Sequence, residues 1–118
     1  MKKTENKKIL TPPEWLDDTA KEEWNRVATE LGKRKILSEG DVTAIELYCK
    51  SYSRWKEAEK QIDSVGSTVF KSGKGNYVQQ LPQIAIAQKY MKICQDFLTE
   101  FGMTPSSRGK MRFLYNDD

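Results

Sequence analysis

The chain has 118 residues, a length that suits one domain with a single hydrophobic core. Hydrophobic residues make up 37% and charged residues 31%, and three tryptophans among the 10% of aromatic residues exclude a disordered composition. Histidine is absent, which excludes Ser–His–Asp and Cys–His catalysis and removes the commonest metal ligand. With two cysteines besides, Cys49 and Cys94, the composition predicts neither a metal site nor a cofactor.

The sequence also indicates where the protein acts. Its longest apolar run, residues 84–87, is far too short to cross a membrane. The lysine-rich beginning has no apolar segment behind it, so we expect no secretory signal. Two cysteines do not make a disulfide framework and fit a reducing compartment. We therefore expect a cytoplasmic protein without a membrane partner.

Positive charge gathers at the two ends of the chain. The formal net charge is +3, while the middle of the chain is close to neutral. Residues 1–10 are predicted to form a flexible basic arm, with the lysines Lys2, Lys3, Lys7 and Lys8. The tail adds Arg108, Lys110 and Arg112. Basic ends on a neutral body suit a polyanion such as DNA, because phosphate contacts release counterions. The alternative is that these ends are simply solvated.

In chain order, the first predicted helix follows a proline-stiffened entry and extends to about Leu31, with Gly32 as its stop. Thr19 and Glu22 have the spacing of a capping box. A second helix opens with a cap signal at residues 38–41 and extends to Val65. At 1.5 Å per residue it is roughly 40 Å long, longer than so small a body can cover alone.

Residues 68–70 and 77–78 are β-branched or aromatic and flank a glycine-rich turn, which predicts a short hairpin. An isolated hairpin is marginal in water, so it has to lean on a helix or on another subunit. A third helix is expected from Pro82 to Gly102, and Thr104 opens a short terminal helix.

The predicted fold is therefore mostly α, with three main helices, one short β-hairpin between the second and third, and a short C-terminal helix. We divide the chain into the arm, a helical oligomerisation and DNA-binding domain over residues 11–103, and a C-terminal segment over residues 104–118.

Two motifs allow a catalytic interpretation beside a structural one. The glycine- and lysine-rich cluster at residues 71–75 lacks the spacing of a phosphate-binding loop and fits a hairpin turn, in which Lys71 and Lys74 can still touch a DNA backbone. The glutamates and lysine of residues 57–60 resemble a string found in metal nucleases. Within a helix, however, such residues are ordinary surface pairs.

The basic run Lys33-Arg34-Lys35 lies between two predicted helices, which allows a helix-turn-helix. Glu39 and Asp41 would then face the DNA from the start of the second helix, and acidic residues are poor readers there. Contact of the run with backbone phosphates is the favoured interpretation.

Aromatic residues at helical spacing, Tyr48, Tyr52 and Trp55, could stack on bases, but packing or a subunit contact is the favoured interpretation. Together with Phe70 and Tyr77 of the hairpin, they are the predicted oligomer interface. Cys49 and Cys94 lie on apolar stripes and are predicted to be buried free thiols.

Several segments of the chain form a recognisable series. They are Pro13-Glu14-Trp15-Leu16, Lys21-Glu22-Glu23-Trp24, Ile36-Leu37-Ser38-Glu39-Gly40-Asp41, Tyr48-Cys49 with Tyr52, Arg54, Trp55 and Glu57, residues 76–82, and Phe101-Gly102-Met103-Thr104-Pro105-Ser106-Ser107-Arg108. In this order and spacing they resemble the small subunit of phage terminases, in the compact helical branch of long-tailed phages. The resemblance implies a ring-forming protein, not an enzyme. Such a protein binds viral DNA at the packaging start site, hands it to a large subunit that carries the ATPase and nuclease, and modulates both.

The expected partners are double-stranded viral DNA, the large subunit and further copies of the chain, in the cytoplasm of an infected or lysogenic bacterial host. The DNA-binding candidates are Lys2, Lys3, Lys7, Lys8, Lys33, Arg34, Lys35, Lys71 and Lys74. Arg108, Lys110 and Arg112 are the candidates for docking the large subunit. A dimeric helix-turn-helix regulator of phage origin is the alternative function, and a small metal nuclease is the third hypothesis.

Overall fold

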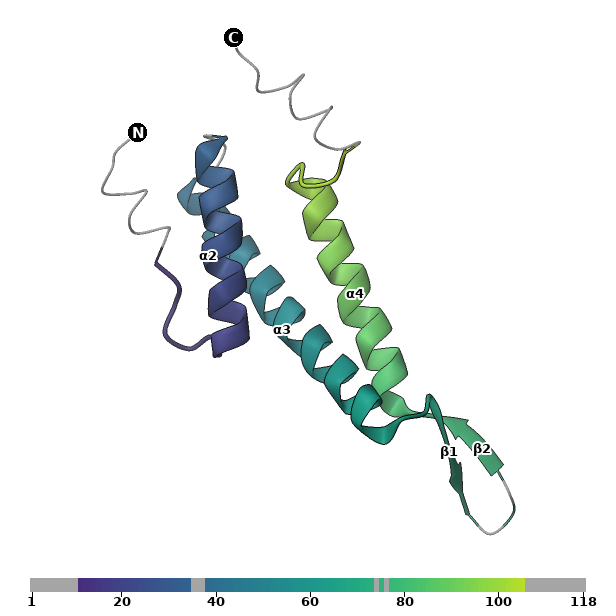
Figure 1. Cartoon of the computed structure of the whole chain (residues 1–118). Coiled ribbons are helices and arrows are strands. Elements are labelled where there is room, and N and C mark those ends of the chain that lie inside the picture. The colour runs from purple at the N-terminus through teal and green to yellow at the C-terminus, as the bar shows by residue number, and fades with distance from the viewer. Residues whose placement is uncertain (1–10, 35–37, 74, 76, 106–118) are drawn as a thin grey trace.

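The computed structural model describes residues 11–34, 38–73, 75 and 77–105. Its helices are α2 (Asp18–Lys33), α3 (Val42–Val65) and α4 (Pro82–Glu100), and a 3-10 turn, η1 (Glu39–Asp41), leads into α3. An antiparallel hairpin of β1 (Val69–Ser72) and β2 (Tyr77–Gln80) separates α3 from α4 (Figure 1). This confirms the predicted three helices and the hairpin between the second and third. The basic arm lies outside the described residues, as does the predicted terminal helix beyond Pro105.

The predicted apolar stripe of α2 is confirmed, since Ala20, Trp24, Val27 and Leu31 are all buried. The predicted capping box at Thr19 is wrong, because the helix begins earlier, with Asp17 at its N-cap. The Asp17 carboxylate accepts a hydrogen bond from the Ser53 hydroxyl, which is the main cause of its lowered pKa. The start of α2 is thus fixed by a contact with α3 rather than by a cap of its own.

The second helix begins and ends as predicted. The Asp41 carboxylate accepts hydrogen bonds from the backbone N–H and the hydroxyl of Ser38, both at 3.0 Å, and so fastens the turn that leads into α3. At the other end Gly66 has a φ of +79°, a left-handed conformation that glycine adopts without strain. Its N–H donates to the carbonyl of Ile62 at 3.0 Å, and the chain then turns towards β1.

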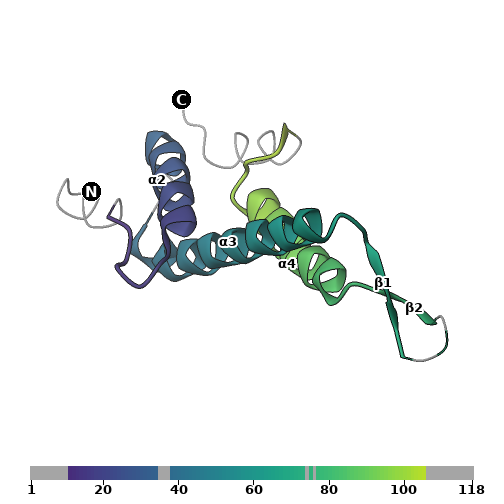
Figure 2. The same ribbon diagram turned by 60° about the horizontal axis from the view of Figure 1, so that its bottom comes forward.

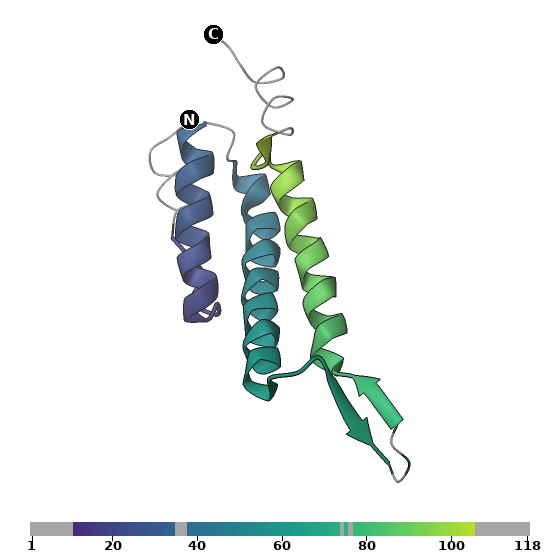
Figure 3. The ribbon, with the colours of Figure 1, turned by 45° about the vertical axis from the view of Figure 1, so that its right-hand side comes forward.

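The three helices lie side by side, with α3 antiparallel to both α2 and α4 (Figures 1 and 3). Because α2 is shorter than α3, it covers only the part of α3 that is remote from the hairpin. The main core lies in that part, where α2 packs against Ile45, Tyr48 and Cys49 of α3 and Phe97 of α4. Near the hairpin the buried apolar residues among those described are only Ala58, Leu81 and Ala87.

The hairpin projects beyond the helices and packs on none of their faces (Figure 2). Seven of its eight strand residues are exposed, and the eighth is partly buried. The radius of gyration, 18.2 Å, exceeds the roughly 13 Å expected for a compact chain of this length. The protomer is therefore a slender rod whose core occupies one half.

Candidate nucleic-acid and subunit interfaces

The structure separates the predicted DNA contacts. Lys33 is exposed in the last turn of α2, whereas Lys71 is exposed on β1, at the opposite end of the protomer (Figure 1). One protomer therefore does not bring these two lysines together. The remaining lysine candidates lie outside the described residues: Lys2, Lys3, Lys7, Lys8, Lys35 and Lys74.

Arg34 differs from its two basic neighbours because it already has acceptors within the protomer. Its Nη1 donates to the carbonyl oxygen of Gly102 at 2.5 Å, and its Nη2 donates to the Glu30 carboxylate at 3.2 Å. Only 22% of the side chain is exposed. In this structure Arg34 joins the ends of α2 and α4, and its predicted contact with DNA stays a prediction.

The start of α3 does not resemble a base-reading helix. Asp41 is used to cap its own turn, and the neighbouring Glu39 is exposed there. Two carboxylates at this position repel backbone phosphates. The geometry therefore adds nothing to the helix-turn-helix hypothesis.

Tyr48 was predicted to lie at a subunit interface, but it is only 2% exposed and belongs to the core of the protomer. Its ring stacks on Phe97, with 4.3 Å between the ring centroids. Tyr52 and Trp55 are partly buried and pack edge to face, 5.7 Å apart, beneath Lys56. An aromatic stripe at helical spacing cannot show which of its members face the core, so the sequence grouped all three.

The Tyr48 hydroxyl donates to the Glu23 carboxylate, which is itself buried in α2. Arg26 completes the cluster, with its Nε 2.9 Å from Glu23. Burial and then this carboxylate raise the pKa of Tyr48, and the hydrogen bond to Glu23 raises the pKa of Arg26. The sequence indicates only an acidic first turn here, because a single glutamate carries no sign of its burial.

The register of the hairpin gives it two mixed faces. Phe70 pairs with Gln79 and Ser72 with Tyr77, so the two aromatic rings lie diagonally on one face. Val69 and Val78 are placed in the same way on the other face. We call these four exposed apolar residues the hairpin patch; Tyr77 is 71% exposed. The aromatic pair was predicted as a contact but the valines were missed, although the alternation of the strands could have revealed them.

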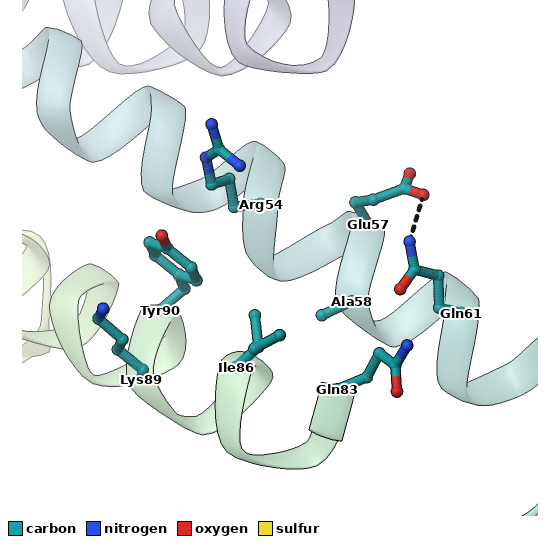
Figure 4. A pocket seen from close by; sticks show the side chains of 8 residues that line it. All are labelled: Arg54, Glu57, Ala58, Gln61, Gln83, Ile86, Lys89 and Tyr90. Atoms are coloured by element: carbon teal, nitrogen blue, oxygen red, sulfur yellow. Dashed lines mark hydrogen bonds between the residues drawn. The ribbon is translucent and has the colours of Figure 1, made fainter. Parts of the chain in front are cut away.

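A groove of about 310 Å³ lies between the parts of α3 and α4 near the hairpin (Figure 4). Ala58 and Ile86 face each other across it, and Arg54 and Lys89 flank it without an ion-pair partner among the described residues. The Gln83 Oε1 atom there is buried and has no hydrogen-bond partner in the described part of the chain. No pattern of residues indicates this groove, because it depends on how two helices cross.

The described residues contain no group of side chains that could hold a metal ion, and none of their helices is long and apolar enough to span a membrane. A family model described as phage terminase, small subunit, matches residues 20–118. The chain belongs to that family. No curated protein and no solved structure matches it significantly. The family supports a role in phage DNA packaging, and its small subunits are generally non-catalytic DNA-binding proteins.

The two cysteines of this small terminase subunit are free and buried, as predicted. Burial raises the pKa of Cys49 to about 12 and that of Cys94 to about 11. Because the thiolate is the reactive form, both thiols are poor nucleophiles and poor metal ligands near neutral pH. They act as small apolar residues of the core.

Proposed function

We propose that this small terminase subunit assembles into a ring, binds viral DNA at the packaging start site, hands the DNA to the ATPase and nuclease large subunit, and modulates that subunit. The observation that carries this proposal is the family match, which spans most of the chain. The protein would act in the cytoplasm of the bacterial host, on double-stranded DNA.

The shape of the protomer supports assembly with identical copies. Its core occupies one half, while the other half carries the hairpin patch and the groove between α3 and α4. When a neighbouring subunit covers exposed apolar side chains, their removal from water lowers the free energy of the assembly. We propose that the hairpin patch is a principal subunit contact, with Tyr52 and Trp55 as secondary candidates. Tyr48 is not proposed, because the core of the protomer already contains it.

The proposed DNA contacts are nonspecific and electrostatic. Lys33 and Lys71 are exposed and make no ion pair with a described residue. A single protomer offers few such charges, but a ring repeats each of them on every subunit. Affinity should therefore come from the assembled ring rather than from one chain.

The dependence of DNA affinity on salt tests this function. Replacing both Lys33 and Lys35 with alanine should weaken binding and lower the slope of log K against log salt, by about 0.9 for each phosphate that the protein no longer neutralises. Arg34 is left in place because it holds the end of α4. Fluorescence anisotropy with a labelled duplex at several salt concentrations measures the slope.

Lys60→Ala is the matched control, because Lys60 is an exposed lysine of α3 away from the basic run. It should leave the slope nearly unchanged. An unaltered slope in the double variant would remove the basic run from the DNA interface. A wild-type chain that fails to bind duplex DNA would contradict the proposed function itself.

Residues 104–118 are proposed to dock the large subunit, through Arg108, Lys110 and Arg112. A chain that ends at Met103 should no longer bind the large subunit but should keep its oligomeric state, because it retains every described residue of the core, Met103 included. Co-purification with the large subunit and native mass spectrometry measure the two properties. Loss of the oligomer would show that the segment belongs to the assembly interface instead.

A further inference from the structure

Arg34 lies where two helices end together. The C-terminal ends of α2 and α4 are neighbours at the end of the protomer remote from the hairpin (Figure 1). Arg34 follows the last residue of α2, and its Nη1 reaches across to the carbonyl oxygens of Gly102 and Phe101, at 2.5 and 3.4 Å. Its Nη2 is held by Glu30, one turn back in α2. The guanidinium thus bridges two elements far apart in the sequence.

The end of α4 leaves these carbonyls free for Arg34. The Met103 N–H donates to the Leu98 carbonyl at 2.7 Å, and the Gly102 N–H donates to the Thr99 carbonyl at 3.1 Å. With a φ of +69° at Gly102, this is a Schellman motif. The motif pairs the carbonyls of residues 98 and 99, whereas those of Phe101 and Gly102 point beyond it. A cation at this position also complements the negative end of the helix dipole.

Both terminal nitrogens of Arg34 therefore donate within the chain, and no bond from Nε to a described residue is seen. A guanidinium binds phosphate most strongly through two parallel hydrogen bonds, and a phosphate bound by Nη1 and Nη2 together competes with the Gly102 carbonyl and the Glu30 carboxylate. The bond from the charged Arg34 to a backbone carbonyl is already charge-assisted, but a phosphate adds a full negative charge that the carbonyl lacks and so competes well with it. Glu30 is 42% exposed and can turn towards water when its partner leaves.

We propose that Arg34 is a switch whose Nη1 and Nη2 bind either the end of α4 or a DNA phosphate, so that DNA bound there releases the Phe101 and Gly102 carbonyls at the end of α4. This inference rests on the proposed DNA binding by the basic run. Linkage makes the coupling reciprocal: whatever loosens the end of α4 makes Arg34 more available and strengthens DNA binding by the same factor. A merely structural arginine would show no such exchange.

Hydrogen–deuterium exchange of the peptide over residues 98–105, with and without a saturating DNA duplex, tests the switch in the full chain. In the wild-type protein, DNA should accelerate exchange of the Gly102 and Met103 amides. In Arg34→Ala, the same two amides should exchange rapidly with and without DNA, and DNA should not accelerate their exchange further. Lys33→Ala is the matched control: it removes a neighbouring charge and should keep the slow exchange of the free protein.

A second variant gives a readout of opposite sign. Gly102→Ala strains the left-handed position and weakens the end of α4, so it should tighten DNA binding several-fold, whereas Arg34→Ala should weaken it. Anisotropy on the same samples keeps two failures apart. If the wild-type chain binds no DNA, the proposed function fails and the switch with it. If DNA binds but exchange stays the same or slows, or if Gly102→Ala does not tighten binding, the switch alone is overturned.

Discussion

Replacing Phe70 and Tyr77 with serine is expected to break the assembly into smaller species, down to the single protomer. The two rings share one face of the hairpin and are exposed, so a neighbouring subunit can bury them. Truncating a well-buried interface aromatic typically costs about 2 kcal/mol, or about 30-fold in the dissociation constant. Two such truncations at every interface are enough to dissociate a ring at micromolar concentration.

Native mass spectrometry and sedimentation of the wild-type chain and the variant measure this effect. Circular dichroism should show that the three helices persist, because the core lies in the other half of the protomer. Gln80→Ser is the control, since it changes an exposed polar residue of the hairpin and leaves the aromatic face intact. A double variant with the wild-type mass would exclude the aromatic face as a subunit contact. A wild-type chain that stops at a dimer would favour the regulator hypothesis.

Glu23→Met is expected to lower the free energy of unfolding by about 3 kcal/mol, the range for removing one member of a buried charged hydrogen-bond cluster. The substitution keeps most of the volume but leaves the Tyr48 hydroxyl buried without an acceptor. Arg26 is 56% exposed and can turn to water, so it adds little to the loss. Urea unfolding followed by the helical circular dichroism signal, at one fixed protomer concentration, measures the change.

Tyr48→Phe distinguishes this explanation from a simple packing defect. On its own it should cost about 1 kcal/mol, because Glu23 keeps its bond to Arg26. The double variant Glu23→Met with Tyr48→Phe should be more stable than Glu23→Met alone, because the buried Tyr48 hydroxyl that lost its acceptor is removed. Costs that simply add would show that the Tyr48–Glu23 hydrogen bond contributes nothing.

The parts of the fold that depend on local sequence could be predicted. The apolar stripe of α2 and the glycine stop at Gly66 follow from residue types at short spacing, and both are present. The start of α2 could not be predicted, because Asp17 is positioned by Ser53, which is 36 residues away. A capping rule considers only residues within one helical turn of the helix start, so it cannot predict this contact.

Some residues of the candidate interfaces could likewise be predicted from the sequence, and others could not. Exposed hairpin aromatics could be foreseen because two strands cannot bury them, whereas Tyr48 lies in the same stripe as Tyr52 and only the helix packing separates them. Arg34 resembles Lys33 in the sequence, since both are basic residues of one run. Only the position of the end of α4 shows that one is engaged and the other exposed.

The conformation of Gly66 affects how neighbouring subunits of the proposed assembly are oriented. A subunit that offers its hairpin at one end and receives a neighbour's hairpin elsewhere makes a head-to-tail contact. Such contacts continue as open filaments unless the rotation per subunit divides a full circle. The left-handed bend at Gly66 sets the direction in which the chain leaves α3 towards the hairpin. A change of conformation at this one residue would redirect the hairpin and so change the rotation between neighbours in the proposed ring.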